Sequence, residues 1–557
     1  MTPKMTPDMI IVNGQAITFD EAHPHANALA IKDGIILSVG ETADIRALAD
    51  SSTRVIDATQ NTILPGFIDS HVHLFGGSAE LDYLDLYGVR GIDSLTDKVR
   101  AWQQTCPDDT IVFAIQADYN IIASGKQTTR QDLDKVLSDR PFAMFAADHH
   151  TIWANTMALE MAGILYGGEV DKGAEIVMAA DGKAAGELRE PSAYGPVLKL
   201  TRYGGRDMIG LVTGRNPEPA ASMQERQLDA DAIARGFKHC ASHGITGLHN
   251  MDGNIYTLEL LKELEQRGDL LCRTEVPFHF KSFDTLDRFA EADMMRRDFG
   301  GDWVWCNRVK MFVDGVVESS TALMLDKYPD LDTVGDAVFD DALFKEACVK
   351  ADAMGLQISV HAIGDRAIRQ TLDGYELAQN RNGKRDSRHR IEHIEVLHPD
   401  DLPRFSELGV VASIQPGHAP FGVYFSPETV ERMLHPHQIS TAYAWQDIRN
   451  TGTKVIFSTD WPVIPVDVMP NIKSAVSPKQ MPAPWRDQRQ SLMDTLESYT
   501  AGNAWVEFNE SKKGRLKAGM MADIVVMSHD LTAMEPENLD QARAQTTICG
   551  GKITYQA

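Results

Sequence analysis

Short apolar runs mark both ends of this chain as β-rich. In the first 60 residues, strand-like runs cover Met9–Val12, Ala16–Phe19, Ala28–Ile31 and Ile35–Val39, and Asp33-Gly34 between the last two is a hairpin turn signal. The same pattern returns at Ile524–Met527, Thr546–Cys549 and Ile553–Tyr555. The two β-rich ends could therefore pair into one small β-domain.

The middle of the chain alternates short apolar runs with helical patterns, which is typical of a parallel α/β fold. The run Ile63–Ile68 reads as one buried strand that leads into two histidines. Eight such strands are expected, ending near Asp69, Leu248, Pro277, Val313, Val360, Ile394, Ile414 and Ser458. Eight parallel strands are what a closed (β/α)8 barrel of the TIM type needs.

The gap between the first and second strands, residues 95 to 225, is too long for one crossover helix. It contains strand-like pieces of its own, Ile111–Ile115 and Phe142–Ala146, and we interpret it as an inserted subdomain. Insertions on this side of a barrel commonly shape substrate entry. The expected boundaries are residues 1–62 and 501–557 for the β-domain of the chain ends, and 63–500 for the barrel.

Candidate metal ligands sit where the predicted strands end. His71 and His73 are two residues apart, so both side chains point the same way from the first strand. Further along, His361, His393 and Asp460 end the fifth, sixth and eighth strands. Imidazole and carboxylate suit a borderline ion such as Zn²⁺, and an open coordination position would make the site hydrolytic.

Lys310 belongs to the same series, on the fourth strand. An ammonium group has no lone pair and cannot bind a metal. If CO₂ has converted Lys310 to a carbamate, its two oxygens can bridge two metals. The alternative is an ordinary lysine that pairs with an acid.

Composition narrows the class of protein. Of the 557 residues, 43% are hydrophobic and 24% charged, as in folded globular proteins. The net charge of −25 argues against nucleic acid or an anionic membrane as a partner. The six cysteines are scattered with no Cys-x-x-Cys pair, and neither a signal peptide nor a run of about 18 apolar residues is present. We expect a cytoplasmic protein.

Several stretches together resemble the amidohydrolase superfamily, and specifically its amidohydrolase-3 (YtcJ-like) branch, which includes N-substituted formamide deformylases. They are Pro65–His73, His150–Asn155, Gly244–Thr246, Val360–Asp365, Arg390–His393 and Gly519–Val526. The resemblance implies a barrel with a composite β-sandwich made from both chain ends. It also implies one or two divalent metals, zinc being the first choice, held by His71, His73, Lys310 as the carbamate, His361, His393 and Asp460.

The expected reaction is hydrolysis of a C–N bond in a small-molecule amide, formamide or related carbonyl compound. A metal-activated hydroxide would attack the carbonyl, and Asp460 would act as general acid/base by passing a proton to the leaving group. The alternatives are an esterase or lactonase on the same centre, a barrel that binds a small molecule without turnover, and, with lower weight, a metal lyase or isomerase. A homodimer is expected by analogy.

Four residues are candidate substrate contacts. His150 and Asn155 lie in the insertion, and His249 ends the second strand together with Asp252. Trp461 follows Asp460 directly. Each has a structural alternative, either stabilising a turn or packing in the core. Arg390 and Glu392, just before His393, are expected to form a structural ion pair.

Overall fold

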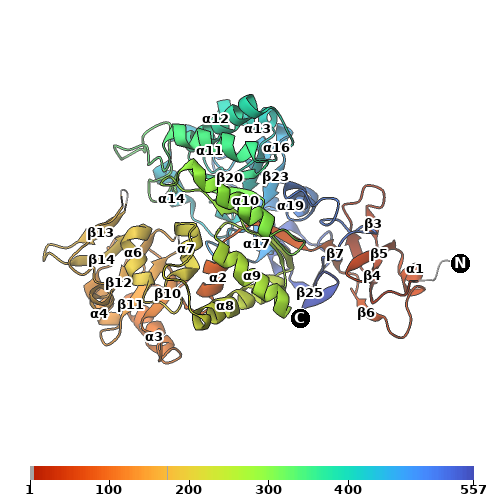
Figure 1. Ribbon diagram of the computed structural model, residues 1–557, viewed down its shortest axis with the longest axis horizontal. Helices are drawn as coiled ribbons and strands as arrows, with labels where there is room; N and C mark the ends of the chain where they lie inside the picture. Colours follow the sequence, from red (N-terminus) through yellow and green to blue (C-terminus); the bar gives the residue numbers. More distant parts are fainter. Residues whose placement is uncertain (1–4, 148, 172–173) are drawn as a thin grey trace. The chain divides into compact units, whose positions relative to one another are not determined.

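The computed structural model describes residues 5–147, 149–171 and 174–557, and Figure 1 traces them in sequence colours. The chain divides into two compact units. We call Leu74–Gly236 the insertion unit, and Met1–His73 with Phe237–Ala557 the main unit.

Eight strand positions of the main unit follow one another as a (β/α)8 barrel requires, and every neighbouring pair is parallel. The third and fourth positions are each interrupted, so they hold two strands. In order the strands are β8 (Phe67–Val72), β15 (Ile245–Asn250), β16 (Arg273–Glu275) with β17 (Phe278–His279), β18 (Val304–Trp305) with β19 (Arg308–Phe312), β20 (Gln357–Ala362), β21 (Arg390–His393), β22 (Val411–Ile414) and β23 (Val455–Phe457). All eight predicted strands are present.

The strands form two arcs, β18-β16-β15-β8 and β17-β19-β20-β21-β22-β23. No uninterrupted ladder runs around the ring among the described residues. The last strand nevertheless returns to the first. Val72 forms a parallel bridge with Trp461, the Asp460 N–H donates to the His71 carbonyl at 2.9 Å, and the His73 N–H donates to the Trp461 carbonyl at 2.7 Å.

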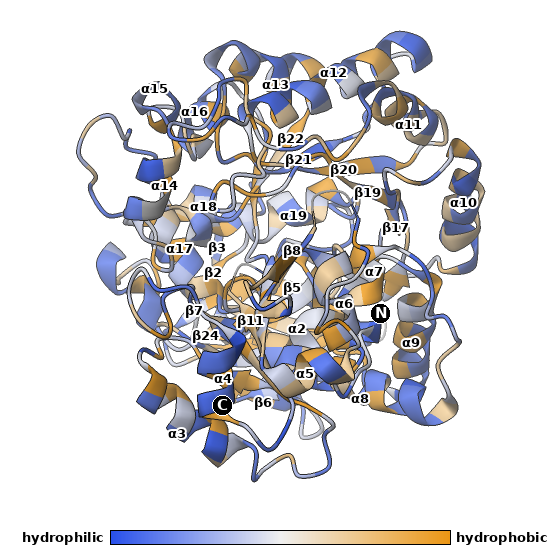
Figure 2. Cartoon of the chain, turned by 90° about the vertical axis from the view of Figure 1, so that its left-hand side faces the viewer, coloured by the Kyte–Doolittle hydropathy of each residue, from blue (hydrophilic) through white to orange (hydrophobic). Residues whose placement is uncertain are grey.

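The helices that separate these strands are amphipathic. On α12 (Asp365–Asn382) the buried residues Ala367, Thr371, Tyr375 and Ala378 recur at helical spacing, and the remaining surface is largely polar, as its mixed colouring in Figure 2 shows. Other helices of the main unit are α9 (Ile255–Arg267), α10 (Phe289–Asp298), α11 (Asp341–Ala353), α13 (Leu402–Leu408), α14 (Pro427–Met433), α15 (Pro436–Ile439), α16 (Trp445–Asn450), α17 (Val468–Val476), α18 (Leu492–Ser498) and α19 (Ala501–Val506). No described helix has the length and apolar character needed to cross a bilayer.

Both chain ends build the β-sandwich, as expected. One sheet has the order β5-β4-β1-β6 and the other β26-β25-β24-β7-β2-β3. The first comprises Ile35–Gly40, Ala28–Lys32, Met9–Val12 and Arg54–Asp57, and the second Lys552–Gln556, Ala544–Cys549, Ile524–Met527, Thr62–Pro65, Gln15–Ile17 and His25–Ala26. Antiparallel pairing of β24 with β7 joins the two ends, and Met9, Ile11, Ile63, Ile524 and Val526 share one apolar core.

One strand prediction was wrong. The run Ile63–Ile68 is two strands, because β7 belongs to the sandwich and β8 to the barrel. Gly66 separates them, and a Cβ there would lie 2.3 Å from the Thr246 side chain. A residue without a side chain therefore allows the close approach at which the chain passes from one sheet to the other.

The insertion unit has its own sheet, of order β13-β14-β12-β11-β10-β9. Its strands are Glu175–Met178, Ala184–Arg189, Thr151–Ala154, Phe142–Ala146, Val112–Ala117 and Leu84–Asp85. Helices α3 (Ile92–Trp102) and α4 (Arg130–Val136) contribute Leu95, Val99 and Leu133 to an apolar core with these strands. The unit therefore has a core independent of the barrel.

The shared sandwich core predicts where the chain ends contribute to stability. Ile524→Ala removes a fully buried side chain and should lower the free energy of unfolding by about 2–5 kcal/mol. Val55→Ala in β6 is the matched control, because Val55 is 49% exposed and its truncation should have little effect. Urea unfolding followed by circular dichroism measures both, and equal effects would contradict the packing described.

Candidate metal centre

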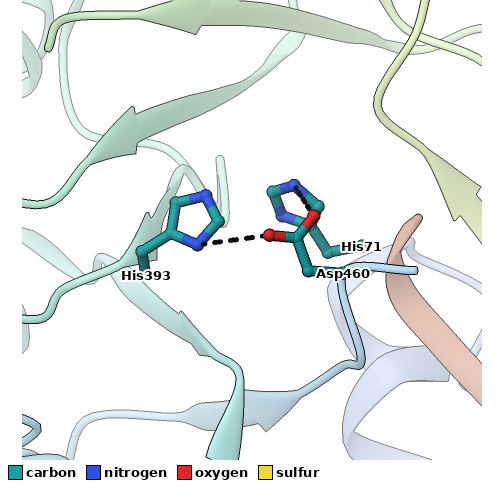
Figure 3. Close-up of side chains that lie close together, drawn as sticks. All are labelled: His71, His393 and Asp460. Atoms are coloured by element: carbon teal, nitrogen blue, oxygen red, sulfur yellow. Dashed lines mark ion pairs between the residues drawn. The ribbon is translucent and has the colours of Figure 1, made fainter. Parts of the chain in front are cut away.

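Three predicted ligands converge at the ends of the barrel strands. His71 in β8, His393 at the end of β21 and Asp460 just after β23 each offer a ligand atom within 4.8 Å of the others. Figure 3 shows the Asp460 carboxylate between the two imidazoles. All three side chains are buried, so the cluster is shielded from bulk water.

His73 joins the cluster through the same carboxylate. Asp460 Oδ1 lies 3.3 Å from Nε2 of His71 and 3.3 Å from Nε2 of His73, while Oδ2 lies 3.8 Å from Nδ1 of His393. The ring of His361 in β20 is next to that of His393, with centroids 4.5 Å apart. The five histidine and aspartate residues of the predicted set are thus one connected group.

Lys310 is the sixth member, in β19. Its ammonium is fully buried, lies 4.6 Å from the centroid of Phe312 and makes no hydrogen bond. Its charge acts on His71, His361 and Asp460, which places it close to the group. Burial is the main reason why the pKa of Lys310 falls to about 8, so part of the amine is neutral near pH 7.

Hydrogen bonds to the ring nitrogens define which nitrogen of each histidine can face a metal. Nδ1 of His71 donates to Glu392 at 2.8 Å and Nδ1 of His73 donates to Asp252 at 2.6 Å. A carboxylate of this kind only accepts, so Nδ1 holds the proton and Nε2 keeps the lone pair. Both Nε2 atoms point at Asp460.

The other two histidines follow the same logic. Nδ1 of His393 donates to the Gln415 side-chain oxygen at 2.8 Å, and the Gln415 amide is oriented because its nitrogen donates to Ser458. In His361 the two ring nitrogens exchange these roles. Its Nε2 donates to the Gly315 carbonyl at 3.1 Å, which leaves the lone pair on Nδ1. In its neutral form, each of these four histidines therefore holds its proton on the nitrogen that meets the protein partner and keeps the lone pair on the other nitrogen.

Electrostatics keep most of these groups in the ligating state. Burial lowers the pKa of His71 and of His361 to about 3, with Lys310 as the next cause, so both rings are neutral. Burial alone would raise the pKa of Asp460, but the surrounding histidines outweigh it and keep the pKa well below its usual value. His73 differs: burial would lower its pKa, but Asp252 and Asp460 raise it to about 9.

The backbone at the site is strained. His393 has a φ of 75°, Ile394 of 55° and Asp460 of 65°, in the left-handed region that L-residues rarely adopt. Such strain persists only where the surrounding structure imposes it and is concentrated at functional sites. Two of the three residues are predicted ligands.

The donor set fits a divalent cation. Asp460 Oδ1 is buried without a hydrogen-bond partner, and so is the Lys310 nitrogen. A buried carboxylate oxygen without a hydrogen bond is costly unless something else compensates it. A cation among Asp460 and the histidine lone pairs would compensate that oxygen, and nitrogen with carboxylate oxygen is the donor chemistry of zinc sites.

The candidate substrate contacts are engaged within the protein. Nε2 of His249 donates to Glu507 at 2.8 Å and its Nδ1 accepts from Arg390 at 2.9 Å, so both nitrogens are used. Asn155 caps α5 (Thr156–Met161) and its amide donates to the Leu137 and Arg140 carbonyls. These contacts favour the structural alternative for His249 and Asn155.

The remaining two candidates differ in exposure. Trp461 is buried, with its ring 5.7 Å from that of His239. His150 in the insertion unit is half-buried, and its Nδ1 lies 3.0 Å from Glu190. Substrate contact by either residue stays a prediction.

Sequence reasoning missed several partners of the ligands. The expected pair of Arg390 and Glu392 does form, but Glu392 also holds His71. His418, after β22, points Nε2 at Asp460 across 3.7 Å and Nδ1 at Glu395 across 3.8 Å. Gln415 and His418 follow a predicted strand end, so the rule that found the ligands would also have selected them.

Comparisons with known proteins match this chain over nearly its whole length. The amidohydrolase-3 model, described as "Amidohydrolase family", matches residues 54–555. YtcJ from Bacillus subtilis (strain 168) is 26% identical over 98% of this chain and 98% of its own length. The N-substituted formamide deformylase of Arthrobacter pascens is 25% identical over 99% of this chain and 98% of its own.

A solved structure agrees with the fold. The crystal structure of an uncharacterized metal-dependent hydrolase from Pyrococcus furiosus is 26% identical with a TM-score of 0.70, and the match covers 93% of this chain and 98% of that one. The resemblance inferred from sequence stretches is confirmed by these matches.

The charge state of His73 predicts how metal affinity depends on pH. The ring must lose a proton before Nε2 binds a cation, and the pKa of His73 is about 9, so affinity should rise as pH increases from neutral toward 9. Competition titration against a chromophoric chelator measures this. Asp252→Asn removes the carboxylate that raises the pKa, so the rise should move to lower pH. An affinity that is constant over this range would contradict the assignment.

Proposed function

The chain belongs to the amidohydrolase family, and we propose that it is a metal-dependent hydrolase of C–N bonds in a small-molecule amide, formamide or related carbonyl compound. The observation that carries the proposal is the buried group of His71, His73, His393 and Asp460, in which a carboxylate oxygen lacks a hydrogen-bond partner. The deformylase relative acts on N-substituted formamides by its name, which supports this substrate class.

In the proposed centre the metal is held by His71, His73, His361, His393 and Asp460, with Lys310 as a carbamate. Zinc is the first choice, in one or two ions per chain. A divalent cation would supply Lewis acidity there, lowering the pKa of water and polarising a carbonyl oxygen. The partly neutral amine of Lys310 supports the carbamate, because CO₂ reacts with the neutral form.

Asp460 is proposed to move the proton of the reaction. Its carboxylate is ionised, so it can accept a proton from the attacking water, and it is held between His71 and His73. The same residue would then donate that proton to the leaving nitrogen. An amine is a poor leaving group until it is protonated, so amide cleavage needs this transfer more than ester cleavage does.

His418 and Glu395 are proposed to assist Asp460. His418 Nε2 faces Asp460 and is buried without a hydrogen-bond partner, while Nδ1 faces Glu395, whose other oxygen accepts from the Tyr443 hydroxyl at 3.1 Å. Glu395 is thereby held beside the ring. We propose that His418 binds a polar atom of the substrate next to Asp460.

The alternatives to amide hydrolysis are an esterase or lactonase on the same centre and a barrel that binds without turnover. The proposal also takes the substrate to be a small molecule, the assembly to be a homodimer and the compartment to be the cytoplasm, as expected from the sequence. Hydrolysis of acylated amines but not of matched esters would favour C–N bond hydrolysis over an esterase or lactonase.

Metal content is the first test. Elemental mass spectrometry of protein purified without chelator should give one or two equivalents of a divalent metal per chain. If Lys310 bridges two ions, Lys310→Met should reduce two equivalents to about one. Protein that contains no metal and takes up none on reconstitution would exclude the proposed function.

The proton-transfer role predicts a selective loss in Asp460→Asn. Turnover of N-formyl and N-acyl amines should fall about 10²–10⁴-fold, because the proton shuttle is lost, and turnover of matched activated esters should fall less. Steady-state kinetics on metal-loaded enzyme, with metal content measured in parallel, checks this. Equal losses on both substrate types would assign Asp460 to metal binding alone.

A further inference from the structure

A buried network of hydrogen-bonded side chains connects the proposed metal ligand His71 to Glu507 in the C-terminal part of the main unit. Its members between these two residues are Glu392, Arg390 and His249. Glu392 accepts from His71 through Oε2 and from Arg390 and Ser359 through Oε1. Arg390 also donates to the Ser70 carbonyl and to Nδ1 of His249.

At its far end, this network includes the ion pair of Glu507 and Lys513. Nε2 of His249 donates to Glu507 at 2.8 Å, and the other Glu507 oxygen lies 2.7 Å from the Lys513 ammonium. Glu507 and Lys513 follow α19, more than 400 residues after His71. The side chains of Arg390, Glu392, His249 and Glu507 are fully buried.

Each link fixes the orientation of the next. Burial alone would raise the pKa of Glu507, but Lys513 and His249 lower it to about 2, so Glu507 is a carboxylate. It can therefore only accept, so the His249 proton is on Nε2 and the Nδ1 lone pair faces Arg390. The pKa of His249 is lowered, first by burial, so the ring is neutral and able to accept.

Arg390 then transmits this orientation to the ligand strand. A guanidinium is planar and presents its donors in a fixed fork, so a partner at each nitrogen restricts its rotation. Its partners are His249, the Glu392 carboxylate and the Ser70 carbonyl, next to His71 in β8. Both the ring and the backbone of His71 are thus tied to the same cation.

We infer that Glu507 is a positioning residue for the metal centre and acts on His71 through His249, Arg390 and Glu392. The inference rests on the proposed function, because it assigns His71 as a metal ligand. Partners that orient a metal-binding histidine typically change metal affinity by about 10–100-fold when removed. Glu507 is separated from His71 by three intervening residues, so we expect the lower end of that range.

The test measures metal affinity and not activity. Full-length wild type and Glu507→Gln are stripped of metal, and the Kd for Zn²⁺ is measured at fixed pH by competition with a chromophoric chelator. Glu507→Gln should bind Zn²⁺ roughly tenfold more weakly. In Co²⁺-loaded protein its visible absorption bands should shift, because the geometry at His71 changes.

Asp352→Asn is the matched control. Asp352 is also a buried carboxylate that holds a buried histidine, His389, at 3.1 Å, and the other nitrogen of His389 accepts from the backbone of Ile358. This pair contacts the backbone of β20 and not a ligand side chain. Asp352→Asn should leave the Zn²⁺ affinity within about twofold of wild type, although it also neutralises a buried carboxylate that is hydrogen-bonded to a buried histidine.

A second pair of variants guards against misfolding of Glu507→Gln. His249→Gln keeps one donor and one acceptor, whereas His249→Leu keeps neither. If Glu507 acts through His249, His249→Leu should bind Zn²⁺ more weakly than wild type, and His249→Gln should recover part of that affinity. Thermal melting of both variants checks that they are folded.

The outcomes are distinct. Wild-type affinity in both Glu507→Gln and His249→Leu overturns the inference while the proposed function stands. Equal losses in Glu507→Gln and Asp352→Asn also overturn it, since they would report general destabilisation. A wild-type protein that binds no Zn²⁺ overturns the proposed function itself.

Discussion

The seam between the first and last barrel strands is the constraint on which this site depends. His71 and Asp460 are nearly 400 residues apart in sequence and meet only because β23 returns to β8. The Asp460 N–H donates to the His71 carbonyl, and the Asp69 carboxylate accepts from the backbone and side chain of Thr459. The hydrogen bonds that close the seam therefore also set the spacing of the ligands.

Charges inside the barrel make this geometry specific. Arg390, Glu392 and His71 are completely or almost completely buried, and a buried charge is tolerated only with a partner and satisfied hydrogen bonds. Because Glu392 accepts from His71, Arg390 and Ser359, few alternative arrangements satisfy it. Apolar side chains in the same places would not select one orientation of the His71 ring.

The sequence was sufficient to predict the strands and to select residues that lie together at the strand ends, because both follow local rules. Apolar runs predict buried parallel strands, and polar residues at their ends meet at one rim. The partners of the ligands do not follow such a rule. Asp252, Gln415 and Glu392 meet the histidines only in the folded protein, from positions 22 to 321 residues away in sequence. The break at Gly66 was missed for a related reason, since hydropathy does not report a change of sheet.

The four histidines of the centre also differ in how they are prepared for a cation. His71, His361 and His393 have a lowered pKa and present a lone pair without further cost. His73 is the exception, because Asp252 and Asp460 stabilise its protonated form. The positive charge beside Asp460 is then the His73 imidazolium. A cation that binds Nε2 of His73 would therefore have to displace a proton from the ring.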